Sequence, residues 1–251
     1  MRFINASFGG KNYSYYNFLR KIGEDVSVFD KSERLFIKFI SNLLPLVRPY
    51  EFLIIKLLMD NCYTYSQLTE KIKERVQIFK ENQYHHALNN LQNKLSCKKH
   101  RHSDKSYVDL NENGYYLNIR QTNKDFLEHV DDIIEYGLVR YNTEFGEFSG
   151  DFKLYGNYYT EQIMLSLCES SLVFYKGTKI MGDRVYVFAG LKKNVSKIHL
   201  DYKDEFINNR TFQWESETGT TFTNITGQKL LNSKTTYIFI RKIEKEDGII
   251  L

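Results

Sequence analysis

The sequence has little proline, little cysteine and no long apolar run. Its 251 residues include two prolines, three cysteines and one tryptophan. The cysteines, Cys62, Cys97 and Cys168, are odd in number and far apart, which argues against a disulfide framework and favours a reducing, cytoplasmic location. No run of about 18 apolar residues is present and no apolar segment follows a basic start, so we expect neither a membrane partner nor a signal peptide.

Motifs of several catalytic classes are missing as well. Gly9-Gly10-Lys11 lacks both the earlier glycine and the following Ser or Thr of a phosphate-binding loop, and no HExxH zinc motif occurs. Cys97, His100 and His102 form C-x-x-H-x-H, but structural zinc sites usually present two close pairs of ligands. We interpret these three residues as part of a basic loop, and we predict no catalytic residue, no metal and no cofactor.

The composition is that of ordinary globular domains. Apolar residues make up 42% of the chain, which is enough for a hydrophobic core. The net charge of +4 is split evenly between residues 1–150 and 151–251. A mildly basic chain is compatible with nucleic-acid binding but does not by itself predict it. The prediction therefore depends on local clusters of basic residues.

The chain divides near Gly146 to Gly150, which gives domains of residues 1–148 and 149–251. Apolar residues at helical spacing cover residues 32–44, with Ser32 as the expected cap, and residues 51–59, 64–76, 82–95 and 123–138. Residues 105–119 alternate around the hairpin signal Asn113-Gly114. Helices followed by a hairpin predict a winged-helix-like domain, in which the helix before the hairpin, residues 82–95, contacts DNA.

The segment between that helix and the hairpin is basic. Lys98, Lys99 and Arg101 are candidate phosphate contacts there. A charge run of this kind is also typical of a solvated linker, and the winged-helix-like domain could instead dock a protein.

After residue 150 the pattern changes to one short helix, residues 160–169, and six short β-like runs separated by glycines. The runs are residues 171–177, 184–193, 196–202, 210–216, 220–225 and 235–243. They predict an α+β chain whose second domain is a compact barrel or bent sandwich. Base-reading barrels of the SRA, PUA-like and B3 groups have this pattern of short strands separated by turns.

The stretch around the single tryptophan is a candidate pocket for a planar base. On a strand, Phe212 and Trp214 share one face, from which a ring can stack on a base. Tyr202 is a possible second wall, Ser216 adds a hydroxyl, and Asp204 could accept a hydrogen bond from the exocyclic amino group of cytosine. The alternatives are that the two rings belong to a strand core and that Asp204 caps a turn.

Basic residues near the expected strand ends are further candidate phosphate contacts. They are Lys192, Lys193, Lys197, Arg210, Arg241 and Lys242.

Five segments carry a family resemblance. They are FGGKNYSYYNFLRKIG (Phe8 to Gly23), LYGNYYTEQIMLSL (Leu154 to Leu167), YKDEF (Tyr202 to Phe206), FQWES (Phe212 to Ser216) and IFIRK (Ile238 to Lys242). These segments resemble the C-terminal coupler and DNA-reading region of SauUSI-like modification-dependent (type IV) restriction enzymes. Those enzymes combine a phospholipase-D-type nuclease, a superfamily II helicase and a DNA-reading tail.

The resemblance implies a DNA-binding specificity module that recognises 5-methylcytosine in duplex DNA by base flipping. Its partners would be methylated double-stranded DNA and the helicase and nuclease domains of a parent restriction endonuclease, and its second domain would be an SRA/PUA-like barrel. The nuclease needs His and Lys two residues apart, a spacing that His102-Ser103-Asp104-Lys105 does not provide. We therefore expect no enzyme in this chain. The alternative is a protein–protein adaptor with no base pocket; a small nuclease, a third interpretation, lacks an acidic metal cluster.

Overall fold

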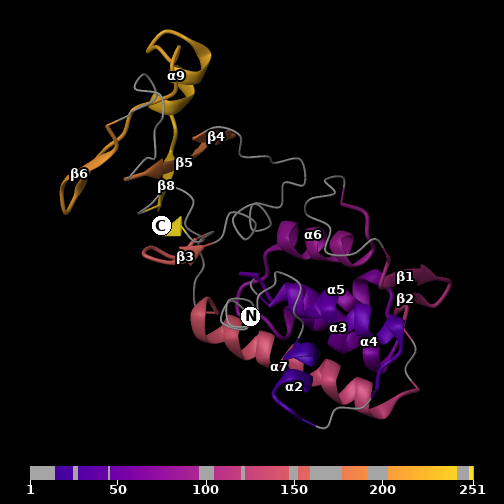
Figure 1. The fold of residues 1–251 in the computed structure, drawn as a ribbon. Coiled ribbons are helices and arrows are strands. Elements are labelled where there is room, and N and C mark those ends of the chain that lie inside the picture. Colours follow the sequence, from indigo (N-terminus) through magenta and orange to yellow (C-terminus); the bar gives the residue numbers. More distant parts are fainter. Residues whose placement is uncertain are drawn as a thin grey trace. The chain divides into compact units, whose positions relative to one another are not determined.

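The computed structural model describes residues 15–24, 28–44, 46–95, 105–119, 122–146, 152–158, 177–191, 203–241 and 249–250. Contacts divide these residues into a helical unit, up to residue 146, and a β-rich unit, from Phe152 onward (Figure 1). The prediction of an α+β chain is confirmed. No helix among the described residues is long and apolar enough to cross a membrane.

The helical unit contains six helices and one hairpin among its described residues. In chain order they are α2 (Tyr15–Lys21), α3 (Lys31–Leu43), α4 (Tyr50–Asp60), α5 (Tyr65–Lys73), α6 (Glu81–Leu91), β1 (Val108–Asn111), β2 (Gly114–Leu117) and α7 (Lys124–Glu144). The predicted hairpin around Asn113 and Gly114 is confirmed, with β1 and β2 antiparallel.

Capping boxes fix the starts of α3 and α5. The Asp30 side chain accepts the backbone N–H of Glu33 at 2.8 Å, and the Glu33 carboxylate accepts the backbone N–H of Asp30 at 2.8 Å. Thr64 and Gln67 form the same reciprocal pair before α5. The expectation that Ser32 caps the first of these helices is wrong, because Asp30 and Glu33 satisfy the backbone donors and leave Ser32 inside the first turn.

The centre of the helical unit is α4. Eight of its 11 residues are buried, and it contacts α5, α6, α7 and β2. A helix that is apolar on nearly all sides belongs in a core. Gly137 of α7 lets the ring of Phe52 approach closely, since a Cβ atom at position 137 would lie 2.5 Å from Phe52 Cε2.

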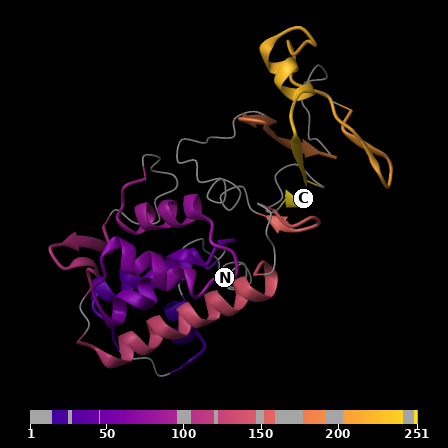
Figure 2. The ribbon, with the colours of Figure 1, turned by 180° about the vertical axis from the view of Figure 1, so that it is seen from behind.

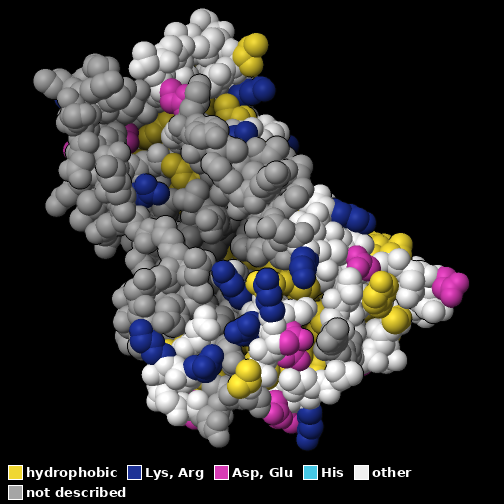
Figure 3. Space-filling view, turned by 45° about the vertical axis from the view of Figure 1, so that its right-hand side comes forward, with side chains coloured by type: hydrophobic (Ala, Val, Ile, Leu, Met, Phe, Trp, Pro, Cys, Tyr) yellow, Lys and Arg dark blue, Asp and Glu magenta, His cyan; other side chains and the backbone are white. Residues whose placement is uncertain are grey.

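The long helix α7 lies along the helical unit (Figures 1 and 2). Arg140 of α7 binds the α3–α4 connection, because its Nη1 donates to the carbonyl oxygens of Leu44 at 2.6 Å and Leu46 at 3.2 Å. Lys and Arg side chains gather on the face of the helical unit seen in Figure 3.

The β-rich unit is built around a sheet with the strand order β3-β9-β8-β5-β4. Its strands are β3 (Asn157–Tyr158), β4 (Thr178–Met181), β5 (Arg184–Gly190), β8 (Thr235–Arg241) and β9 (Ile249–Ile250). Strands β5 and β8 are parallel, and the other neighbours are antiparallel. Because a parallel pair needs a long crossover, the chain between β5 and β8 has room for further elements.

That crossover contains a hairpin and a short helix. The hairpin is formed by β6 (Glu205–Asn208) and β7 (Thr211–Gln213), and the helix is α9 (Ile225–Leu231). The hairpin is a separate two-stranded sheet, and it extends away from the five-stranded sheet in both views (Figures 1 and 2).

Aromatic rings form the core of the β-rich unit. The rings of Tyr186 and Tyr237 stack with centroids 5.3 Å apart, and those of Phe188 and Phe239 stack at 5.1 Å. The parallel register places each pair directly opposite. Phe152 packs edge-on against Phe239 at 5.1 Å. These pairs hold the central strands together.

Two predictions for this unit need correction. The described strands form no closed barrel, so the SRA/PUA-like barrel is not supported; a parallel pair lies inside an open sheet, and strand runs alone do not reveal pairing. The strand expected at residues 220–225 is wrong, because the Asn224 side chain accepts the Gly227 N–H at 2.8 Å and starts α9. The expected elements at residues 160–169 and 196–202 lie outside the described residues, and so does the element expected at 171–177 except for Gly177.

Candidate nucleic-acid interface

A backbone bridge joins the hairpin to the start of α5. The Tyr63 N–H donates to the Tyr115 carbonyl at 3.1 Å, and the Tyr115 N–H donates to the Tyr63 carbonyl at 2.7 Å. The order is therefore α4, bridge, α5, α6, hairpin, with Tyr63, two residues before α5, in the position of a third strand. Gly114 makes the approach possible, because it has φ +116° and a Cβ atom there would lie 2.3 Å from the Tyr63 carbonyl oxygen.

Only a narrow stripe of α6 is exposed. Its exposed residues are Glu81, Asn82, His85 and Asn89. Every other residue of the helix is buried. The helix ends at Leu91, with Gln92 as its C-cap, four residues earlier than the sequence predicts. It contains no Lys or Arg, so any contact it makes with DNA would come from neutral or acidic side chains.

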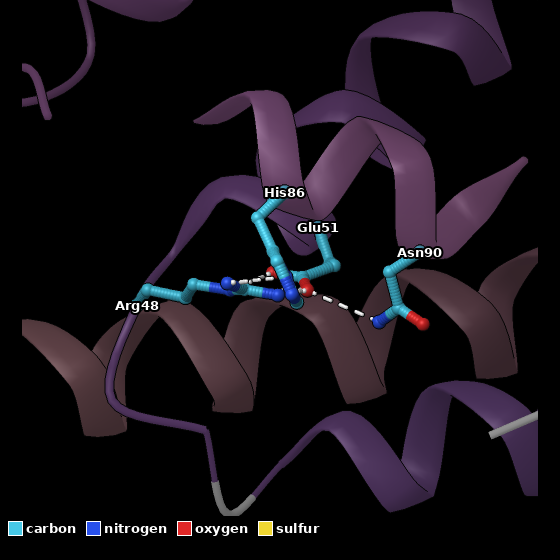
Figure 4. A network of polar contacts seen from close by, with 4 residues as sticks. All are labelled: Arg48, Glu51, His86 and Asn90. Atoms are coloured by element: carbon cyan, nitrogen blue, oxygen red, sulfur yellow. Dashed lines mark hydrogen bonds and ion pairs between the residues drawn. The ribbon is translucent and has the colours of Figure 1, made fainter. Parts of the chain in front are cut away.

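A buried polar network fixes α6 on α4 (Figure 4). Arg48, in the connection before α4, donates from Nε to both carboxylate oxygens of Glu51, at 3.1 and 3.0 Å, and its Nη2 also contacts Glu51. Asn90 of α6 donates to the same carboxylate at 3.2 Å. All of these side chains are buried, so the charge of Glu51 depends on these donors.

The same network sets the protonation of a histidine. Arg48 Nη1 lies 3.0 Å from His86 Nδ1. Because a guanidinium group only donates, Nδ1 is the acceptor, and the His86 ring is neutral with its proton on Nε2.

A cavity of about 650 Å³ lies between α4, the α5–α6 connection and the second half of α7. Basic side chains of Lys56, Arg75 and Lys80 line it, together with Glu135 and the apolar Val139. Lys56 Nζ donates hydrogen bonds to the carboxylates of Glu135 and, at 3.2 Å, of Asp131, and these bonds raise the pKa of Lys56, while burial acts in the opposite direction.

The residues predicted for the base pocket lie on the β6–β7 hairpin and its continuation. Phe212 and Trp214 are half-buried, as are Phe188 and Tyr237 of the sheet, whereas Tyr186 and Phe239 are fully buried. The Phe212 ring packs against Phe206, with centroids 4.9 Å apart. Strand β7 ends at Gln213, so the alternation argument that puts Phe212 and Trp214 on one face does not extend to Trp214.

The structure describes two of the three polar side chains predicted for the pocket, Asp204 and Ser216. Asp204 Oδ1 accepts the backbone N–H of Glu215 at 3.2 Å, which closes the open end of the hairpin. Ser216 is half-buried, two residues after Trp214. Tyr202 lies outside the described residues. The structure therefore brings Asp204 close to the backbone that follows Trp214.

Two of the predicted phosphate contacts can be located. Arg210 is exposed in the β6–β7 turn, and Arg241 is half-buried at the end of β8. The other candidates lie outside the described residues: Lys98, Lys99, Arg101, Lys192, Lys193, Lys197 and Lys242. The C-x-x-H-x-H segment, Cys97 to His102, lies there as well.

Sequence reasoning missed the buried network, the bridge and the cavity. A charged pair three residues apart, Arg48 and Glu51, beside an apolar helix was an available signal for the network. On the side of α5 the bridge involves a single residue, Tyr63, so it produces no periodic pattern in the sequence.

Comparison with protein families gives two matches. Residues 4–144 match the family described as domain of unknown function DUF8090. Residues 152–249 match the family described as domain of unknown function DUF3427. No curated protein matches the chain. The boundary between the helical and β-rich units in the chain falls at the end of residues 145–151, which separate the two matched segments.

Replacement of Arg48 by Met should destabilise the helical unit by about 3–5 kcal/mol, because the buried Glu51 carboxylate loses its main partner. Urea unfolding of the full chain measures this loss. The exposed Arg34 of α3 provides the control, and Arg34→Met should change stability by less than about 0.5 kcal/mol. Addition of Glu51→Leu to Arg48→Met should recover much of the loss. Equal stability of the Arg48 and Arg34 variants would contradict the role given to the network.

Replacement of Gly114 by Ala should break the bridge to Tyr63. Gly23, in the turn after α2, has φ +87° and open space around it, so Gly23→Ala carries the backbone strain without the steric clash. We expect Gly114→Ala to cost more than the roughly 1–3 kcal/mol of such strain. Hydrogen exchange of the Tyr63 and Tyr115 amides should accelerate in this variant alone, and unchanged exchange rates would show that the bridge tolerates a side chain.

Proposed function

The chain belongs to the DUF8090 family, and we propose that it is a cytoplasmic DNA-binding specificity module that recognises 5-methylcytosine in duplex DNA. It would flip the modified base out of the duplex and act for an ATP-dependent restriction endonuclease whose nuclease and helicase lie outside this chain. The observation that carries the proposal is the partial exposure of Phe212, on a hairpin separate from the five-stranded sheet, and of Trp214, directly after that hairpin. A ring with an accessible face can stack on an extruded base, whereas a core ring cannot.

The surroundings of the aromatic pair support this proposal. Arg210 lies exposed in the turn of the same hairpin, where it can contact a phosphate. Asp204 lies at the other end, next to the residue after Trp214. A carboxylate is the acceptor that suits the exocyclic amino group of cytosine. A stacking ring, a cation and a carboxylate on one hairpin are the parts that base recognition requires.

The helical unit supports DNA binding through its connectivity. The order α4, bridge, α5, α6, hairpin is that of a winged helix, in which the second helix of a helix-turn-helix pair enters the major groove. Together with the resemblance to type IV restriction enzymes, this order favours a domain that couples a motor to a DNA reader.

A protein–protein adaptor is the second candidate. The cavity beside α4 favours it, because basic side chains and the exposed Val139 line a recess that suits an acidic partner segment. Glu112, exposed in the β1–β2 turn, favours it too, since an acidic hairpin tip repels phosphates. A gel shift at varied salt separates the two: the DNA reader binds methylated duplex more tightly than unmodified duplex, and the adaptor binds neither at submicromolar concentration.

Replacement of Trp214 by Ala should abolish the preference for methylated duplex. Stacking contributes about 1–3 kcal/mol per base, so we expect the ratio of the two dissociation constants to fall by about 5-fold or more. Phe222, which is 78% exposed in the same unit, supplies the control, and Phe222→Ala should keep the preference. Circular dichroism checks that both variants fold. A folded Trp214→Ala variant with its preference intact would remove Trp214 from the pocket.

Replacement of Arg210 by Gln should weaken binding equally for methylated and unmodified duplexes. The loss of one phosphate contact should also reduce the slope of log affinity against log salt by about 1. Lys229→Gln, at an exposed position of α9, is the matched control and should leave the slope unchanged. Salt-independent binding by the unaltered chain would argue against any phosphate contact.

A further inference from the structure

The exposed stripe of α6 has a composition that the proposed function does not explain. Asn82, His85 and Asn89 are spaced by three and four residues, so they lie on one face of the helix. The residues between them are buried. A helix with such a narrow exposed face gains little stability from these side chains, yet all three carry hydrogen-bonding groups.

The stripe is held in place by contacts on the buried side of α6. Asn90 and His86 join the network of Glu51 and Arg48, and the N–H of Lys80 donates to the Tyr50 hydroxyl at 2.6 Å at the start of the helix. These bonds fix the rotation of α6 about its axis, so the outward residues point in a fixed direction.

His85 is also oriented from outside the helix. Its Nε2 lies 2.9 Å from the hydroxyl of Tyr65, and the two rings stack with centroids 5.6 Å apart at 21°. The pair leaves Nδ1 as the ring nitrogen for an external partner. Tyr65 belongs to α5, so both helices of the helix-turn-helix pair contribute to this surface.

The chemistry of the stripe suits base edges better than phosphates. Asn bonds adenine through N6 and N7 in a bidentate manner, and His can donate to or accept from other major-groove atoms. None of the three side chains is a fixed cation. The distance from Asn82 to Asn89 along the helix is about 10 Å at 1.5 Å per residue, which spans about three base pairs at 3.4 Å each.

Basic residues flank the C-terminal end of the stripe. Lys94 follows α6 and is exposed, and the exposed Lys105 lies two residues before Tyr107. The Tyr107 N–H donates to the Leu91 carbonyl at 2.9 Å, which brings the start of the hairpin to the end of α6. The exposed Glu81 lies at the opposite end of α6, with Oε1 3.8 Å from His85 Nε2. Cations beside the neutral residues Asn82, His85 and Asn89 complement a groove whose edges are phosphates and whose floor is made of bases.

We propose that Asn82, His85 and Asn89 read about three base pairs in the major groove, with an A·T pair opposite Asn82 or Asn89. This inference rests on the proposed function in that the chain binds duplex DNA, but it assigns a sequence preference to the helical unit, separate from recognition of the modified base. Lys94 and Lys105 position the backbone, and the stripe supplies specificity.

The experiment selects duplexes with the full chain. The pool carries one fixed 5-methylcytosine and randomised flanking positions, and a parallel pool carries cytosine at the fixed position. We expect an enriched segment of about three base pairs that contains A·T pairs. Asn82→Ala and Asn89→Ala should each reduce the preference at one position by about 5-fold or more. Neither variant should change the preference for methylation or the salt slope.

The matched control is Asn142→Ala, at an exposed position of α7. It should leave the selected sequence unchanged. The inference is overturned if the unaltered chain selects no flanking sequence, or if folded Asn82 and Asn89 variants select the same sequence as the unaltered chain. A chain that selects the flanking segment equally in both pools supports the inference while contradicting recognition of 5-methylcytosine. A chain that prefers methylated DNA whatever the flanking sequence supports recognition of 5-methylcytosine and contradicts the inference about α6. A chain that binds no DNA contradicts both the proposed function and this inference.

Discussion

The helical unit depends on one buried carboxylate. Glu51 lies inside an otherwise apolar helix, and its charge is matched by Arg48 and by the amide of Asn90. Removing such a group from water costs several kcal/mol, and only good geometry repays it. The network therefore selects one arrangement of α4 and α6, because a rotation of α6 about its axis would withdraw Asn90 and His86 from their partners. The order and direction of the outward side chains follow from that selection.

The two units solve the same problem of burial by different means. In the helical unit a single apolar helix is wrapped by its neighbours, and Gly137 and Gly114 allow close approach at two points. In the β-rich unit, two parallel strands carry stacked rings on one face, and short antiparallel strands flank them. The connection between those parallel strands contains the β6–β7 hairpin, with Phe212 on it and Trp214 directly after it. The candidate base site therefore lies outside the five-stranded sheet and contributes little to its core.

Local signals in the sequence predicted local structure well. Asn113-Gly114 identified the hairpin, and helical spacing found α3 to α7. Signals that act between distant residues were not visible. Tyr63 pairs with Tyr115 through backbone atoms alone, so no side-chain pattern marks the bridge. Strand runs were recognised in the second unit, but nothing in them states that β5 and β8 are parallel, and the barrel prediction failed for that reason. Asn224 was read as part of a strand because its role as a helix cap depends on the turn before it. For the candidate site, the sequence found the aromatic residues but not the Asp204–Glu215 bond beside them.

The strand order of the five-stranded sheet has a consequence for how the protein is made. Strand β8 lies in the middle of that sheet, although it is among the last elements in the chain. Contacts between β5 and β8 close a loop over residues 191–234, and such long-range closure is slow compared with the local contacts of helices. During synthesis the helical unit can fold while the β-rich unit still waits for its central strand. Strand β5 then exposes an unpaired edge until residues 235–241 emerge, and an unpaired strand edge of this kind can pair with another chain.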